Sequence, residues 1–99
     1  MLHLSQNHLQ CVRDILNQHI PNRIVYAFGS RVTAIHLKPH SDLDLCIMGD
    51  PTLSLTEYAV LREAFAESEL PIRVDLVDWE SLTPEFQNII QTQGIERII

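Results

Sequence analysis

Apolar residues recur at helical spacing in three parts of the chain. Pro21 marks the end of the first segment. The second follows Ser54, a good N-cap, and Glu57 completes a Ser-x-x-Glu capping box. Thr83 precedes the third as an N-cap, and Pro84 occupies its first helical position, where proline is favoured. The pattern therefore predicts helices over residues 5–19, 55–69 and 84–92.

Three shorter runs, rich in β-branched and aromatic residues, are typical of strands. Gly29 and Ser30 end the first run and can begin a helical turn. The second run follows a loop, because the residue before Pro39 is disfavoured in helical backbone. The predicted strands cover residues 23–28, 42–48 and 72–77. The element order α-β-α-β-α-β-α predicts one domain over residues 1–99 of the α/β (α+β) class, with a small sheet and flanking helices.

Composition and charge narrow the classes of function. The 99 residues suit one domain, and 20% charged residues are ordinary for a soluble globular protein. Thirteen acidic residues against seven lysines and arginines give a net charge of −6, and the few cations form no basic face. Direct nucleic-acid binding is therefore not expected, whereas a nucleoside triphosphate remains possible with a divalent cation. Two isolated cysteines, no secretory leader and no membrane-length apolar run indicate a cytoplasmic protein without a membrane association.

Two aspartates stand one residue apart inside the second predicted strand. Side chains at positions i and i+2 of a strand point to one face, so Asp42 and Asp44 project together while Leu43 and Leu45 face the core. Paired carboxylates repel each other unless a cation lies between them, and oxygen ligands suit Mg²⁺ or Mn²⁺. If the third strand lies beside the second, Asp75 completes a triad able to hold two ions.

The turn after the first predicted strand suits phosphate binding. Gly29 permits close approach of backbone N–H groups to a phosphate, and the Ser30 hydroxyl can bond it. Arg31 follows directly and can contact the same triphosphate. Each feature alone is common: an Asp-x-Asp pair is more often a cap or turn, and Asp75 could simply pair with Arg73. Their combination on three successive strands favours the functional interpretation.

The stretch from Tyr26 to Leu45, together with Val74-Asp75-Leu76, resembles the minimal nucleotidyltransferases (MNT) of the DNA polymerase β superfamily. The resemblance covers essentially the whole chain and implies a palm-like nucleotidyltransferase fold with a small mixed sheet. It implies that Gly29 and Ser30 grip the triphosphate and that the three aspartates bind two Mg²⁺ and serve catalysis. Many members read Gly-Ser-Arg-x-x-Gly before the Asp-x-Asp pair, and this chain has Ala34 at the last of those positions.

The resemblance also implies a partner and a reaction. Such proteins act as antitoxins beside HEPN-domain toxins, and active members transfer AMP from ATP to a tyrosine of the toxin, which is a ribonuclease. A hetero-oligomer of the two proteins is therefore expected. The alternative is an inactive antitoxin that neutralises the toxin by binding alone. Antibiotic-type small-molecule modification is disfavoured, because 99 residues leave no separate acceptor-binding domain.

Overall fold

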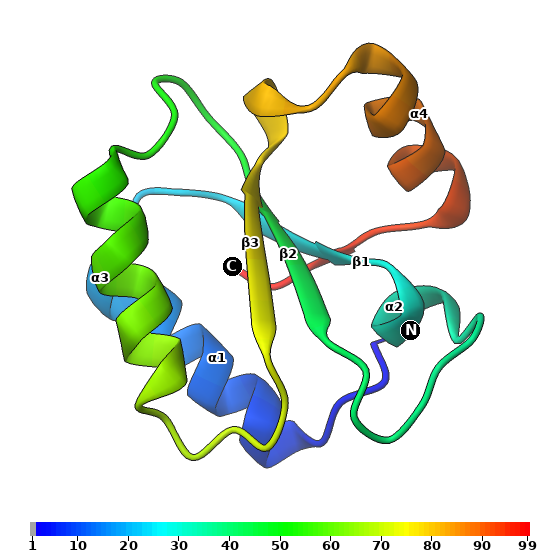
Figure 1. The fold of residues 1–99 in the computed structure, drawn as a ribbon, viewed down its shortest axis with the longest axis horizontal. Helices are drawn as coiled ribbons and strands as arrows, with labels where there is room; N and C mark the ends of the chain where they lie inside the picture. Colours follow the sequence, from blue (N-terminus) through cyan, green and yellow to red (C-terminus); the bar gives the residue numbers. More distant parts are fainter. Residues whose placement is uncertain (1) are drawn as a thin grey trace.

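A mixed four-stranded sheet forms the centre of the computed structural model, which describes residues 2–99 (Figure 1). Over these residues the strand order is β3-β2-β1-β4. Strand β2 pairs antiparallel with β1 and parallel with β3, and β1 pairs antiparallel with β4. The strands are β1 (Val25–Phe28), β2 (Leu43–Ile47), β3 (Val74–Asp78) and β4 (Glu96–Arg97).

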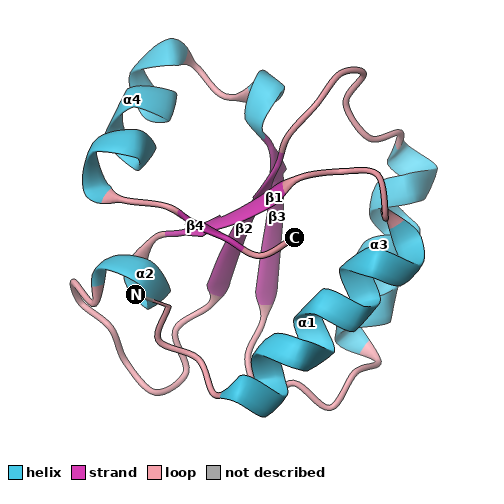
Figure 2. Cartoon of the chain, turned by 180° about the vertical axis from the view of Figure 1, so that it is seen from behind, coloured by secondary structure: helices cyan, strands magenta, loops and turns pink. Residues whose placement is uncertain are grey.

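Two long helices cover one face of this sheet, as the view from behind shows (Figure 2). Helix α1 (Gln6–His19) buries a stripe of Leu9, Val12 and Leu16 at helical spacing. Helix α3 (Leu55–Ala66) buries Leu61 and Phe65 and begins at the predicted capping box. In that box the Glu57 N–H donates to Ser54 Oγ over 3.1 Å, and the Ser54 N–H donates to Glu57 Oε1 over 2.9 Å. The N-terminal end of α3 is thus satisfied by its own side chains.

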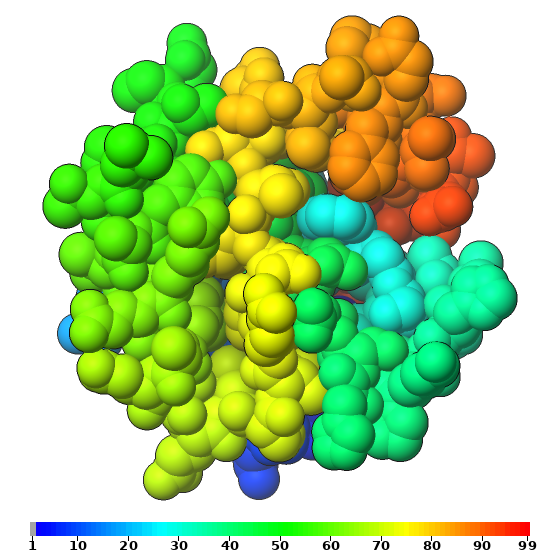
Figure 3. Space-filling view, viewed as in Figure 1, coloured from blue at the N-terminus to red at the C-terminus, as the bar shows by residue number. Residues whose placement is uncertain are grey.

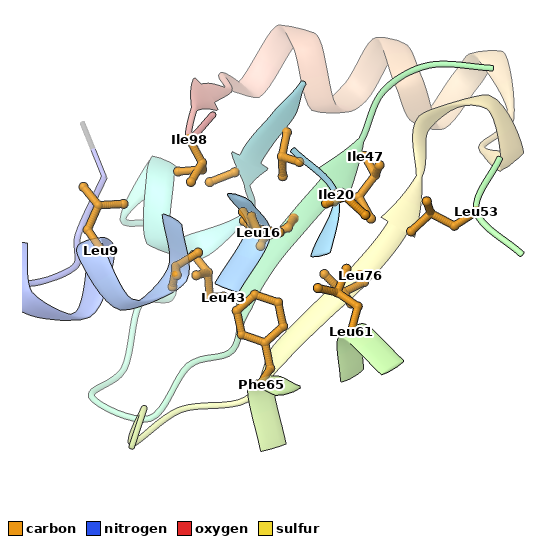
Figure 4. Packing of buried hydrophobic residues seen from close by; sticks show 14 of the residues in the cluster. Leu9, Leu16, Ile20, Leu43, Ile47, Leu53, Leu61, Phe65, Leu76 and Ile98 are labelled. Carbon is orange, nitrogen blue, oxygen red and sulfur yellow. The ribbon is translucent and has the colours of Figure 1, made fainter. Parts of the chain in front are cut away.

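The main core lies between this helical layer and the sheet (Figure 4). Alternate residues of the strands point into it, including Leu43 and Leu45 of β2, both fully buried. Ile98, next to β4, joins the same cluster. Strand β2 therefore directs Leu43 and Leu45 towards α1 and α3, and Asp44 points to the opposite face. Among residues 2–99, no helix has the length and apolar character needed to cross a membrane.

Two shorter helices flank the opposite face. Helix α2 (Ser30–Thr33) follows β1 directly, and α4 (Pro84–Gln93) follows a 3₁₀ turn at Trp79–Ser81. All the predicted helices and strands are present, and the sheet order confirms that the third strand lies beside the second. The predicted helix over residues 55–69 ends earlier, at Ala66. Strand β4 has no counterpart in the sequence prediction, because two residues are too few to show an alternating pattern.

Helix α4 differs from its prediction in what it buries. The amphipathic pattern predicts one apolar face from Phe86, Ile89 and Ile90, with the core favoured over a partner surface for Phe86. Only Ile90 is buried. Phe86 and Ile89 remain 43% and 49% exposed. The ring of Phe86 instead meets Phe28 of β1 edge to face, with 6.5 Å between the ring centroids. Phe86 and Ile89 stay exposed because α4 lies at the end of the sheet and outside the α1/α3 layer (Figure 1).

Candidate active site

The three predicted carboxylates lie on the face of the sheet opposite α1 and α3, where Asp75 and Asp42 are near enough to affect the pKa of Asp44. Asp44 of β2 and Asp75 of β3 are register partners on adjacent parallel strands. Asp42 precedes β2 and lies two residues before Asp44, on the same side of the chain. All three side chains are partly buried. Around them, residues of β2 (green) and β3 (yellow) reach the surface between α3 and α2 (Figure 3).

The pKa of Asp44 is raised because its carboxyl is partly buried and lies near two other carboxylates. The pKa of the Asp44 carboxyl is raised from 3.8 to about 6, mainly by burial and then by the nearby Asp75 and Asp42 carboxylates. A carboxylate surrounded in this way holds its negative charge at a cost in free energy. A divalent cation at this position would relieve that cost, because it offsets both the burial and the repulsion.

The turn after β1 lies directly against Asp44. Gly29 has φ of 79° and ψ of −158°, a conformation that residues with side chains rarely adopt. A Cβ atom at this position would collide with Asp44 Oδ2 and lie 3.3 Å from Asp44 Cγ. Glycine is therefore required twice here, by the backbone angle and by the carboxylate. Because α2 begins at Ser30, the predicted phosphate turn starts beside the carboxylates.

Arg31 is engaged with the backbone around the site. Its Nε donates to the Ser41 carbonyl over 3.1 Å, Nη1 to the His3 carbonyl over 3.0 Å and Nη2 to the Pro39 carbonyl over 2.9 Å. These bonds hold the loop that leads into Asp42. The sequence predicts a phosphate contact for Arg31, which stays a prediction. The positioning role was missed, because the carbonyl partners belong to loops and leave no mark in the sequence.

Asp75 has a second neighbour just before its own strand. Arg73 Nη2 lies 3.5 Å from Asp75 Oδ1, as the structural interpretation of the sequence anticipates. The two side chains are 80% and 46% exposed, so the pair is screened by water and weak. It leaves Asp75 free to turn towards another cation. Across residues 2–99, no three acidic, histidine or cysteine side chains are already drawn together as ready metal ligands.

A further buried carboxylate belongs to the scaffold. Asp78, at the end of β3, accepts a hydrogen bond from the Leu53 N–H over 3.5 Å. It also bonds the hydroxyl of Tyr58, whose pKa rises through burial and this contact. Strand alternation places Asp78 on the core side of the sheet, away from Asp75. It therefore fastens β3 to α3 and takes no part in the carboxylate cluster.

Comparison with known proteins agrees with this geometry. The family described as polymerase beta, nucleotidyltransferase matches residues 10–97. The chain therefore belongs to this nucleotidyltransferase family. It is also 43% identical over 90 residues to the probable protein adenylyltransferase MntA of Haemophilus influenzae, covering 91% of this chain and 78% of that protein.

Solved nucleotidyltransferase structures share the fold. A mutant MntA-containing toxin–antitoxin complex is 28% identical, with a TM-score of 0.67 over 95% of this chain and 71% of that one. An MNT antitoxin in complex with a tri-AMPylated HEPN toxin of Shewanella oneidensis is 24% identical. Its TM-score is 0.70, over 97% of this chain and 72% of that one, and at this identity it shows the fold alone.

This chain departs from the Gly-Ser-Arg-x-x-Gly pattern at a position where the backbone favours glycine. Ala34 occupies the position of the second glycine in the Gly-Ser-Arg-x-x-Gly pattern, and its φ of 64° and ψ of 4° are left-handed. Glycine adopts this conformation without steric cost, whereas alanine does not. The position closes α2, since the Ala34 N–H donates to the Ser30 carbonyl over 2.8 Å. A glycine at this position would therefore suit the left-handed backbone better than alanine does.

Proposed function

We propose that this protein is an antitoxin that transfers AMP from ATP to a tyrosine hydroxyl of a HEPN-domain toxin. The observation that carries the proposal is the carboxylate cluster on β2 and β3, with the Gly29 turn against Asp44. Membership of the nucleotidyltransferase family supports the reaction type. The relative at 43% identity supports the protein acceptor, since it is named as a protein adenylyltransferase.

The donor set fits magnesium. Carboxylate oxygens are the ligands that Mg²⁺ prefers, and the raised pKa of Asp44 marks a position where a cation is favourable. Asp42, Asp44 and Asp75 would hold the metal, and Mn²⁺ would suit the same oxygens. When bound, Mg²⁺ neutralises phosphate charge and so stabilises the charge that develops on the leaving pyrophosphate.

The proposed transfer forms one bond and breaks one bond at the α-phosphorus of ATP, and side chains of this protein take up the proton and hold the phosphates. The acceptor oxygen forms a bond to the α-phosphorus of ATP, and the bond from that phosphorus to the β-phosphate oxygen breaks. The electron pair leaves with pyrophosphate, and Asp75 takes the proton of the hydroxyl. Gly29 and Ser30 hold the triphosphate, because the Gly29 turn admits a phosphate to the backbone and Ser30 offers a hydroxyl. Arg31 steadies this arrangement through the loop before Asp42.

Charge favours a protein acceptor. The net charge of −6 disfavours a polynucleotide acceptor. The same charge favours a basic partner such as a ribonuclease, since complementary charge speeds encounter. Both partners would act together in the cytoplasm as a hetero-oligomer.

A labelling experiment tests the proposal. A HEPN-domain protein from the same organism is incubated with this chain, Mg²⁺ and ATP labelled at either the α- or the γ-phosphate. We expect the α-label alone to enter the HEPN protein, and Asp75→Asn to lower the rate by at least about a hundredfold. Label from the γ-phosphate would indicate a kinase. A neutralised toxin that carries no label would indicate the binding antitoxin.

A further inference from the structure

A cavity of about 650 Å³ opens beside the carboxylate cluster, between the C-terminal half of α3 and β3. In Figure 3 these elements are the green helix and the yellow strand that form the left and centre of the visible face. Phe65, Leu70 and Pro71 provide apolar lining, and Arg62 and Arg73 provide charge. Asp75 lines the same cavity, which therefore reaches the candidate active site.

The cavity lies on the side of the carboxylates opposite the phosphate turn. The sheet order is β3-β2-β1, with the Gly29 turn at the end of β1 and Asp44 on β2 between them. Asp75 follows on β3, which is an edge strand of the sheet, and the cavity adjoins it. In phosphoryl transfer the attacking and leaving oxygens lie roughly in line across phosphorus. With pyrophosphate held at Gly29 and Ser30, the acceptor must therefore approach from β3.

The lining matches a polypeptide acceptor. Leu70 and Pro71 offer an apolar surface for an aromatic ring, and the guanidinium groups of Arg62 and Arg73 offer partners for carboxylates. Arg62 lies over the ring of Tyr58, 5.2 Å from its centroid, which limits its freedom before binding. Two of the seven cationic lysine and arginine residues in an acidic chain thus adjoin one cavity.

We propose that this cavity is the acceptor groove, and that it binds a segment of the partner protein carrying the acceptor tyrosine between acidic residues. The inference rests on the proposed adenylyl transfer and adds the place and chemistry of acceptor binding. The tyrosine ring packs against the apolar wall, and its hydroxyl faces Asp75. The flanking carboxylates pair with Arg62 and Arg73.

Matched substitutions on one helix test the groove. Ala66 lines the cavity and is exposed, so Ala66→Trp fills the groove without entering the core. Ala59 is exposed on the same face of α3, two turns earlier and outside the cavity, so Ala59→Trp is the control. We expect Ala66→Trp to raise the KM for the partner protein about tenfold or more, the loss typical of a strong interface contact. The Kd for a non-hydrolysable ATP analogue should stay within about twofold of the wild-type value.

A charge reversal gives a second measurement. Arg62→Glu should raise the KM for the partner and weaken its dependence on salt, whereas Arg97→Glu on β4, outside the cavity, should do neither. Thermal melting checks that each variant is folded. Equal KM values for Ala66→Trp and Ala59→Trp, with transfer intact, would overturn the proposed acceptor groove and leave the proposed adenylyl transfer standing. Absence of AMP transfer by the wild-type protein would instead overturn the proposed function, and the groove with it.

Discussion

Replacing Asp44 with asparagine is expected to stabilise the metal-free fold while it removes adenylyl transfer. The pKa of Asp44 lies at about 6 instead of 3.8, because the carboxyl is partly buried and faces Asp75 and Asp42. A rise of this size corresponds to about 3 kcal/mol between the charged and neutral forms. Since the side chain also contacts water, we discount the value to about 1–2 kcal/mol. Asparagine keeps the shape and lacks the charge.

The sign of the pH dependence follows from the raised pKa. The folded state holds its proton up to about pH 6, whereas the unfolded chain loses it near 3.8, so the wild-type free energy of unfolding falls between these values. Above pH 6 the full cost of the charge is present. Asp44→Asn should therefore unfold at a higher urea concentration than the wild type at pH 8, and the difference should shrink towards pH 4.

Urea denaturation at the two pH values measures this effect, with Asp50→Asn, an exposed aspartate in a loop, as the matched control. Adding Mg²⁺ should stabilise the wild type and leave Asp44→Asn unchanged, since a ligand stabilises only the form that binds it. An Asp44→Asn variant that is less stable than the wild type at pH 8 would refute the reasoning. It would show that the carboxylate is satisfied by contacts within the folded chain.

Three more substitutions have defined outcomes. Gly29→Ala should lower the free energy of unfolding by more than about 1 kcal/mol and abolish transfer, because the new Cβ collides with Asp44 Oδ2 at a positive φ. Urea denaturation checks the first effect and the labelling assay the second, and a stable, active variant would contradict the prediction. Ala34→Gly should raise the free energy of unfolding by about 0.5–1 kcal/mol, since glycine relieves the left-handed strain but gives a more flexible unfolded chain; an unchanged or lower urea midpoint would contradict it. Arg31→Gln should lower the free energy of unfolding by about 1–3 kcal/mol and shift the amide NMR signal of Asp42, because three backbone carbonyls lose their hydrogen-bond donor. An unchanged signal would mean that Arg31 does not position the loop before Asp42.

Much of the fold could be predicted from local patterns. The stripes of α1 and α3, the capping box at Ser54 and the three longer strands each leave a periodic or capping signal in the sequence, and the structure confirms them. The triad needed one more condition, that β3 lies beside β2. The register of Asp44 with Asp75 meets that condition. The catalytic and binding roles of these side chains stay predictions.

Other features depend on contacts that local patterns do not record. Phe86 has an amphipathic position, and its exposure follows from where α4 lies relative to the sheet. Arg31 binds carbonyls of distant loops, and any residue type could supply those carbonyls. Ala34 carries a left-handed backbone that its residue type disfavours. The cavity beside Asp75 arises only when α3 and β3 are placed together.

Intact-mass spectrometry of a HEPN-domain protein from the same organism is the direct test of adenylyl transfer. The protein is weighed after incubation with ATP, Mg²⁺ and either the wild-type chain or the Asp42→Asn/Asp44→Asn double variant. We expect a gain of one or more AMP groups with the wild type and no gain with the double variant. An unchanged mass beside a stable complex and a silenced toxin would contradict this expectation, since the chain would then neutralise its partner by binding alone.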